Sequence, residues 1–347
     1  MSETGAIAVL PAAAVQHVET QDRNMRGKYM AIGKTKVAVI GCGLVGSTLS
    51  YYLASNRICN KLLLIDLNEK KAWAEATDLR HSLGYSNSKV QIESGSYGDC
   101  GDADVVILAV AAPYRDGMTR LDMYEKACSI MDSIIPPVMG SGFEGIFLVI
   151  TNPVDLITQY VQKLSGLPDR KVIGTGTSLD SARLRMYLAD LMDVDPRSVD
   201  ALCMGEHGDS QMIPWSQVTV GGKSFHHILK DDPNRLGGLS LDDVLKEITG
   251  IAYEVVRSKG ATCYGIASVS GQIVRAILFD ENKVIPVSCM LHGEYGFEGI
   301  YAGIPAVLNS QGVKELVTYH LTEEETARLN RSLGILEGCR RKGSEKE

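Results

Sequence analysis

The feature that most constrains the fold is a glycine-rich turn between an apolar run and a helical segment. Residues 36–40 (KVAVI) are apolar and β-branched, which predicts a buried strand. GCGLVG follows at 41–46, and residues 47–55 have helical character. Asp66 ends a second apolar run, twenty residues after the turn. A strand, this turn, a helix and an acid at this distance predict a dinucleotide-binding βαβ unit.

Each part of this unit has a mechanical role. Gly41 makes the turn, Gly43 admits a pyrophosphate, and Gly46 lets the helix pack on the strand. The phosphates would then lie at a helix N-terminus. Asp66 would accept hydrogen bonds from a ribose 2′-hydroxyl and would repel a 2′-phosphate, which predicts NAD rather than NADP. The alternative is a glycine-rich turn with an acid that caps a strand.

Strands and helices are expected to alternate as far as residue 150, which predicts a Rossmann-type, doubly wound parallel sheet. We place a domain boundary at Asn152. The expected units are an N-terminal arm at 1–33, an NAD-binding domain at 34–152, a catalytic domain at 153–340 and a charged tail at 341–347. The expected strands lie at 36–40, 62–65, 90–93, 104–110 and 145–150, and the helices at 47–55, 70–82 and 123–139.

The second half of the chain is expected to be an α+β catalytic domain with antiparallel strands. A helix opens at 177–185, with Thr177 or Ser178 as its N-cap. A strand at 199–204 leads into GEHGDS, and a hairpin turns at Gly221-Gly222 between 217–220 and 223–228. Further helices are expected at 241–258, 264–279 and 321–336, and further strands at 284–290 and 303–308.

Two segments fall where the parallel strands end, which is where such sheets bind ligands. Residues 112–120 are polar and turn-rich and carry Arg115 and Arg120, as a closing lid would. Asn152 precedes Pro153 at the end of a strand, so its amide could face a ligand. The alternatives are two solvated loop arginines and an ordinary turn asparagine.

The stretch Gly205–Ser210 holds a histidine between two glycines. His207 can change its charge near neutral pH, as a proton-transfer catalyst must. Asp180 and Arg183 are spaced i and i+3, so both project from one helix face. Arginine grips carboxylates in two parallel hydrogen bonds, and an aspartate beside it could orient an imidazole. The alternatives are a histidine in a tight turn and a surface ion pair.

Composition narrows the choice of partners. The 347 residues are 45% hydrophobic and carry a net charge of −7, with no basic cluster of the kind that binds nucleic acid or anionic lipid. No apolar run reaches the ~18 residues of a membrane span.

Eight scattered cysteines without a C-x-x-C argue against a metal site and for reduced thiols in a cytoplasm. The arm lacks the basic start of a signal peptide. We therefore expect a small-molecule substrate.

The motifs GCGLVG, DGMTRLD, ITNPVD, IGTGTSLDSARLR and GEHGDS occur in this order. With them the chain resembles the lactate/malate dehydrogenase superfamily over about residues 34–338. The resemblance is nearest to L-lactate and L-2-hydroxyisocaproate dehydrogenases. It implies an NAD-dependent L-2-hydroxyacid dehydrogenase, a homodimer or homotetramer, with no metal. A catalytically idle NAD-binding protein on the same fold is the alternative from another class.

The resemblance also implies roles for individual residues. His207 protonates the substrate carbonyl oxygen, and Asp180 fixes the tautomer of its ring. Arg183 binds the substrate carboxylate, Arg120 polarises the carbonyl, and Asn152 contacts both cofactor and substrate. The residues expected to contact NAD are Gly41, Gly43, Leu44, Val45, Gly46, Asp66, Ala111, Ala112 and Asn152.

The lid and pocket wall bear on the choice of substrate. Malate dehydrogenases carry an arginine six residues before the catalytic one and lactate dehydrogenases a glutamine; here that position is Tyr114, followed by Arg115. Thr262 matches the threonine of the lactate dehydrogenase pocket. A neutral tyrosine favours a 2-oxo monocarboxylate such as pyruvate, whereas Arg115 keeps oxaloacetate, and thus malate dehydrogenase, as the alternative.

Some bacterial lactate dehydrogenases are activated by fructose 1,6-bisphosphate, which an arginine and a histidine bind at a subunit interface. Arg185 matches the arginine of that pair, but Asp200 stands in place of the histidine. Because a carboxylate repels a bisphosphate, we expect no such activation.

Overall fold

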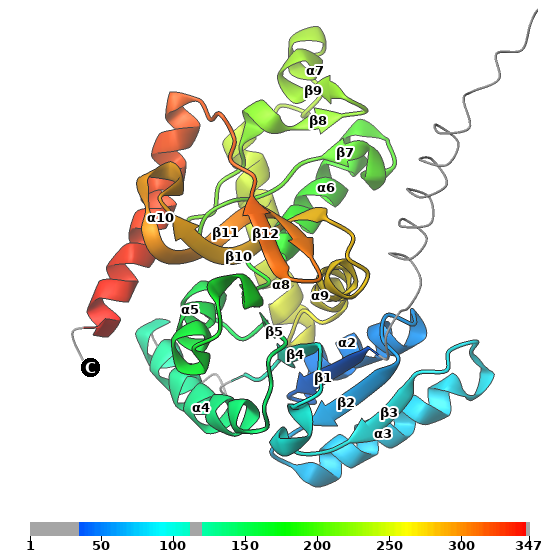
Figure 1. Cartoon of the computed structure of the whole chain (residues 1–347). Coiled ribbons are helices and arrows are strands. Elements are labelled where there is room, and N and C mark those ends of the chain that lie inside the picture. The colour runs from blue at the N-terminus through cyan, green and yellow to red at the C-terminus, as the bar shows by residue number, and fades with distance from the viewer. Residues whose placement is uncertain (1–34, 112–119, 345–347) are drawn as a thin grey trace, which may run out of the picture.

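The computed structural model describes residues 35–111 and 120–344, and its strands form one large sheet and one small one (Figure 1). The expected arm at 1–33, nearly all of the expected lid and the last three residues of the tail lie outside the described residues. The large sheet has nine strands in the order β12-β11-β10-β6-β5-β4-β1-β2-β3. Its first six strands in chain order pair in parallel, which confirms the Rossmann-type prediction.

The parallel strands are buried on both faces, which explains why they appear in the sequence as continuous apolar runs. In β1 (Lys36–Ile40), Val37 and Val39 pack into the core on one face, while Ala38 and Ile40 pack into the core on the other. The other strands are β2 (Lys61–Ile65), β3 (Gln91–Ser94), β4 (Val105–Leu108), β5 (Ile146–Val149) and β6 (Val172–Gly174). The connecting helices are α2 (Leu44–Ser55), α3 (Glu69–Ser82), α4 (Arg120–Gly140) and α5 (Val154–Ser165).

The antiparallel strands of the second half extend the same sheet. Ser288 of β10 (Lys283–His292) pairs with Gly174 of β6, and β11 (Glu298–Asn309) and β12 (Gly312–Leu316) follow outward. In Figure 1 these strands lie between the nucleotide-binding half below and α6 and α7 above. The helices of this half are α6 (Ser178–Met192), α7 (Phe225–Asp231), α8 (Leu241–Lys259), α9 (Tyr264–Leu278) and α10 (Glu323–Ser344).

Two of the expected strands are wrong in part. Only Val199–Asp200 forms a strand, β7. Residues 201–206 are buried, but their backbone groups bond mainly to side chains or to single backbone partners, so they form no strand ladder. The small sheet is completed by β8 (Thr219–Val220) and β9 (Lys223–Ser224). At Phe225 the chain turns into α7, and the Phe225 ring stacks on Trp215 with the ring centroids 5.2 Å apart. The strand expected at 223–228 is wrong beyond Ser224, because so short a run has no clear periodicity.

Besides α7, the described part of the chain forms three helices or strands that were not expected, namely α5, β6 and β12. Since β6 continues the parallel pairing to Gly174, the parallel sheet extends past Asn152. The domain boundary placed at Asn152 stays a prediction. The helix α10 continues to Ser344 and so includes the start of the expected tail. Among the helices in the described ranges, none combines the length and the apolar character needed to cross a bilayer.

Replacing Gly46 by alanine should destabilise the fold. A Cβ there would overlap with the carbonyl oxygen of Gly41, so α2 would have to move away from β1. We expect a loss of about 2 kcal/mol in the free energy of unfolding, measured by thermal and urea denaturation. Gly43→Ala is the matched control, because a Cβ there meets nothing within 4 Å. Equal melting of the two variants would contradict this packing argument.

Candidate active site

The glycine turn and Asp66 form a cradle at the carboxyl ends of β1 and β2. Gly41 has a φ of +99°, which favours glycine, and its N–H donates to the Ile65 carbonyl at 2.8 Å. The Asp66 carboxylate accepts the N–H groups of Cys42 at 2.8 Å and Asn68 at 2.9 Å. These bonds fix the acid beside the turn. Because the space next to Gly43 is open, the cradle fits the pyrophosphate and ribose of a dinucleotide.

The other expected cofactor residues border this cradle or follow a neighbouring strand. Leu44 opens α2 with 64% of its surface exposed, and Val45 beside it is half-buried. Ala111 is exposed three residues after the end of β4. Ala112 lies outside the described residues. The contacts of all these side chains with NAD stay predictions.

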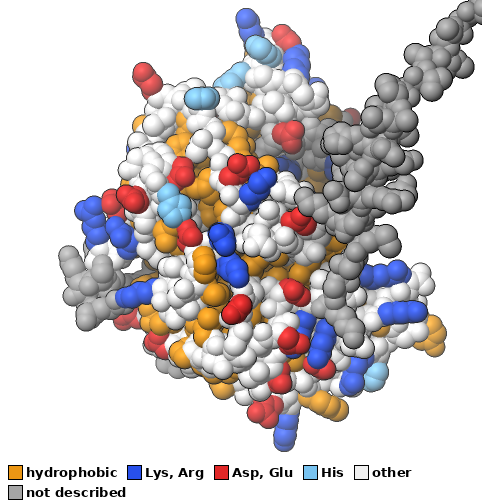
Figure 2. All heavy atoms as spheres, in the orientation of Figure 1, with side chains coloured by type: hydrophobic (Ala, Val, Ile, Leu, Met, Phe, Trp, Pro, Cys, Tyr) orange, Lys and Arg blue, Asp and Glu red, His pale blue; other side chains and the backbone are white. Residues whose placement is uncertain are grey.

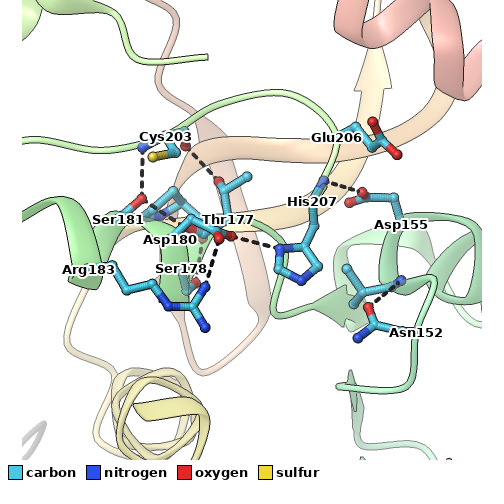
Figure 3. Close-up of polar contacts among 12 residues, drawn as sticks. Asn152, Asp155, Thr177, Ser178, Asp180, Ser181, Arg183, Cys203, Glu206 and His207 are labelled. Carbon is cyan, nitrogen blue, oxygen red and sulfur yellow. Dashed lines mark hydrogen bonds and ion pairs between the residues drawn. The ribbon is translucent and has the colours of Figure 1, made fainter. Parts of the chain in front are cut away.

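His207 and Asp180 form the central pair of the site. Figure 3 shows the Asp180 carboxylate between the imidazole and the Arg183 guanidinium. His207 Nδ1 lies 2.7 Å from Asp180 Oδ2, and Arg183 NH1 donates to Asp180 Oδ1 at 3.0 Å. Asp180 is buried, where an uncompensated charge would be costly, and these two neighbours compensate its charge. The structure therefore brings together three of the residues that the sequence singled out.

The start of α6 is docked against the chain that leads to His207. Thr177 donates from Oγ1 to the Cys203 carbonyl at 2.6 Å, and the Cys203 N–H donates to Ser181 Oγ at 2.8 Å. Thr177 holds the expected N-cap position, but its side chain makes no capping bond because the hydroxyl serves this contact. These two bonds hold the first turn of α6, which carries Asp180, against the chain that leads to the histidine. No local signal in the sequence marks either role.

The backbone of His207 is held from another direction by α5. Its N–H donates to Asp155 Oδ2 at 2.8 Å (Figure 3). Burial raises the pKa of this fully enclosed Asp155 to about 6, although the bond from the His207 N–H opposes the shift. Asp155 belongs to the ITNPVD motif, but α5 was not expected, so its inward direction was not foreseen.

The electrostatics of the pair favour a protonated imidazole. Burial alone would lower the pKa of His207, but the charge and hydrogen bond of Asp180 outweigh it and the pKa is raised. For Asp180, burial acts to raise the pKa, yet His207 and Arg183 hold it below its usual value. On the face shown in Figure 2, acidic and basic side chains are interspersed. An anionic ligand would therefore be attracted locally, by groups such as Arg183.

The remaining expected site residues are placed less fully. Asn152 is exposed after β5, where its side-chain oxygen accepts the Val154 N–H at 3.2 Å. Thr262 is half-buried in the connection between α8 and α9. Arg120 is the first residue of α4, but its side chain is not described, and Tyr114 and Arg115 lie outside the described residues. The substrate contacts of these residues stay predictions.

Comparison with known families identifies the fold of both halves of the chain. Residues 35–174 match the NAD binding domain of lactate/malate dehydrogenase, and residues 177–347 match its alpha/beta C-terminal domain. The chain belongs to the lactate/malate dehydrogenase family. The expected cofactor, NAD, is confirmed by the match to its binding domain.

The dehydrogenase is similar to curated enzymes over nearly their whole length. It is 46% identical to L-lactate dehydrogenase 3 of Bacillus thuringiensis over 87% of this chain and 95% of the relative. It is 43% identical to L-lactate dehydrogenase 2 of Bacillus cereus over 88% of this chain and 98% of the relative. The ligand-bound minor L-lactate dehydrogenase of Enterococcus mundtii superposes with a TM-score of 0.84 at 40% identity, covering 88% of this chain and 97% of that one.

Replacing Asp180 by asparagine should lower the pKa of His207, because the buried ring loses the charge that stabilises its protonated form. We expect a decrease of about one unit or more in an NMR titration of the histidine rings, with His207 assigned from the spectrum of His207→Gln.

Asp195→Asn is the control for this titration, because Asp195 pairs with Arg197 in a surface ion pair. It should leave the titration of His207 unchanged. A His207 midpoint in Asp180→Asn equal to that of the unaltered protein would show that Asp180 does not set the charge of the ring.

Proposed function

We propose that this NAD-dependent 2-hydroxyacid dehydrogenase interconverts L-lactate and pyruvate, or a somewhat larger pair of monocarboxylic acids. The observation that carries the proposal is the buried Asp180 carboxylate shared by His207 and Arg183. This arrangement provides a proton donor and a carboxylate-binding group side by side. The relatives named L-lactate dehydrogenase, at 43% to 46% identity, support the same substrate class.

The proposed mechanism assigns one task to each group. Bound NADH supplies the hydride that reduces the substrate carbonyl carbon. His207 donates the proton to the carbonyl oxygen, and Asp180 holds its Nδ1 and stabilises the imidazolium before transfer. Arg183 binds the substrate carboxylate. Its bond to Asp180 occupies only one of the guanidinium N–H donors, so the guanidinium keeps further donors for this contact. Arg120 polarises the carbonyl as the negative charge develops. In the reverse direction His207 removes the hydroxyl proton.

The choice of a monocarboxylate rests on the sequence of the lid. Tyr114 offers no positive charge to a second carboxylate, and Thr262 matches the pocket wall of lactate dehydrogenases. Arg115 favours the second candidate, a malate dehydrogenase acting on oxaloacetate. Neither Tyr114 nor Arg115 belongs to the described residues, so substrate kinetics must decide between them.

We also propose that the enzyme works in the cytoplasm as a homodimer or homotetramer. No disulfide joins the eight cysteines, which suits a reducing compartment, and burial raises the pKa of several of them, including Cys59 to about 12. The homodimer or homotetramer is what membership of this family implies. Arg185 and Asp200 line one cavity, and the acid there supports the expectation that fructose 1,6-bisphosphate does not activate the enzyme.

Replacing His207 by glutamine should abolish turnover without preventing cofactor binding. We expect kcat for pyruvate reduction to fall by about a thousandfold or more, because the substrate oxygen loses its proton donor. NADH binding, measured by fluorescence titration, should change less than twofold. Retained turnover would remove His207 from the mechanism, and an unaltered protein without turnover on any 2-oxo acid would favour the idle NAD-binding alternative.

The substrate is tested by NADH oxidation with pyruvate, 2-oxoisocaproate, phenylpyruvate and oxaloacetate, compared by kcat/KM. We expect a monocarboxylate to lead, and the ranking of the three by size to define the side-chain pocket. If oxaloacetate leads by a hundredfold, about 2.7 kcal/mol of transition-state binding, the enzyme is a malate dehydrogenase and Arg115 is the candidate partner of the second carboxylate.

A further inference from the structure

The backbone that leads into His207 is fixed at three consecutive N–H groups by three different elements. The Gly205 N–H donates to the Gly303 carbonyl of β11 at 2.9 Å. The Glu206 N–H donates to Ser332 Oγ of α10 at 2.8 Å, and the His207 N–H donates to Asp155 of α5 at 2.8 Å. Only the last of these anchors touches the catalytic residue itself.

Ser332 occupies the middle anchor and is completely buried. Its hydroxyl accepts from Glu206 N and lies 3.0 Å from Ser210 Oγ. Because Ser210 donates its own proton to the Glu206 carboxylate, Ser332 donates to Ser210. The three residues thus form a closed ring of hydrogen bonds that joins both ends of the catalytic loop, residues 205–210, to α10.

The packing around this ring leaves little freedom. A Cβ at Gly205 would overlap with Ser332 Oγ, and Gly205 also has a φ of +96°. The first glycine of the motif is therefore required both by its conformation and by the approach of α10. Because Glu206 is itself buried, its N–H would have no ready replacement partner without the Ser332 hydroxyl.

We propose that Ser332 is a positioning residue for catalysis: from the C-terminal helix it sets the backbone of residue 206 so that the His207 ring meets Asp180. The proposal rests on the proposed role of His207. A ring held at 2.7 Å from Asp180 Oδ2 tolerates little displacement, and errors of about 1 Å in such groups cost about a hundredfold in rate.

Displacement of the ring would also alter its titration. The charged groups around His207 are Asp180 and Arg183 on α6, Asp155 on α5 and Glu206 in the loop. Reduction of a 2-oxo acid needs the protonated ring, so activity falls as the pH rises through its pKa. A looser contact with Asp180 lowers that pKa and moves the fall in activity to lower pH.

The test is Ser332→Ala in the full-length enzyme with NADH and its best substrate from the panel. We expect kcat to fall ten- to a hundredfold, KM and NADH affinity to change less than threefold, and the midpoint of the pH profile to move down by about half a unit. The matched control is Ser216→Ala, which removes a hydroxyl that donates to Glu325 Oε2 of the same helix at 2.7 Å. The control should keep both kcat and the midpoint.

Two outcomes would overturn the proposal. One is an unchanged kcat and midpoint in Ser332→Ala. The other is a loss of activity that follows only the fraction of protein able to bind NADH, with an unchanged midpoint, because that pattern indicates a purely structural residue. If Ser332→Ala does not fold, Ser332→Cys fills the same space but offers the Glu206 N–H only a weak sulfur acceptor. A lowered midpoint in that variant supports the proposal and an unchanged one refutes it.

His207→Gln is measured in parallel to separate this proposal from the proposed function. Full turnover in His207→Gln refutes the role of the histidine and hence both statements. Loss of turnover in His207→Gln together with unaltered kinetics in Ser332→Ala refutes the positioning role alone.

Discussion

The charge on Asp180 is the constraint on which the rest of the site depends. A carboxylate that is removed from water must be compensated by nearby donors or positive groups. Here the imidazole of His207 and the guanidinium of Arg183 supply them, and Asp180 also lies in the first turn of α6, where the helix dipole favours a negative charge. The same arrangement that makes the buried acid tolerable also prepares a protonated imidazole beside an anion-binding arginine.

The sheet explains how residues far apart in the chain reach this charge. The Gly41 turn follows β1, Asp66 follows β2, Ala111 follows β4 and Asn152 follows β5. Asp180 lies in the helix that follows β6. Each residue therefore projects from the carboxyl end of a parallel strand, the edge at which such sheets bind ligands. The antiparallel strands enter the same sheet beside β6, and β11 lies next to the catalytic loop through the bonds between Gly205 and Gly303.

The sequence predicts the parallel sheet, the cofactor and the central triplet of His207, Asp180 and Arg183, because local signals mark each of them. Glycines with special geometry, strand ends and an i, i+3 pair are visible within a few residues. Asp155 and Ser332 carry no such mark. A serine on a charged amphipathic helix looks the same in the sequence whether it faces solvent or, as here, a backbone N–H 126 residues away. The strand expected at 199–204 is wrong for residues 201–204, because burial produces the same apolar run with or without a ladder.

The cysteines have a practical consequence. Seven of the eight thiols are buried or half-buried, and burial raises the pKa of Cys42, Cys59 and Cys100 to about 12, so these three are protonated and unreactive at neutral pH. Cys339 alone is exposed, and it lies on α10, two turns beyond Ser332. A maleimide dye would therefore label the native enzyme selectively at the end of the helix that holds the catalytic loop. The chain thus carries its own attachment point for an optical probe of that helix.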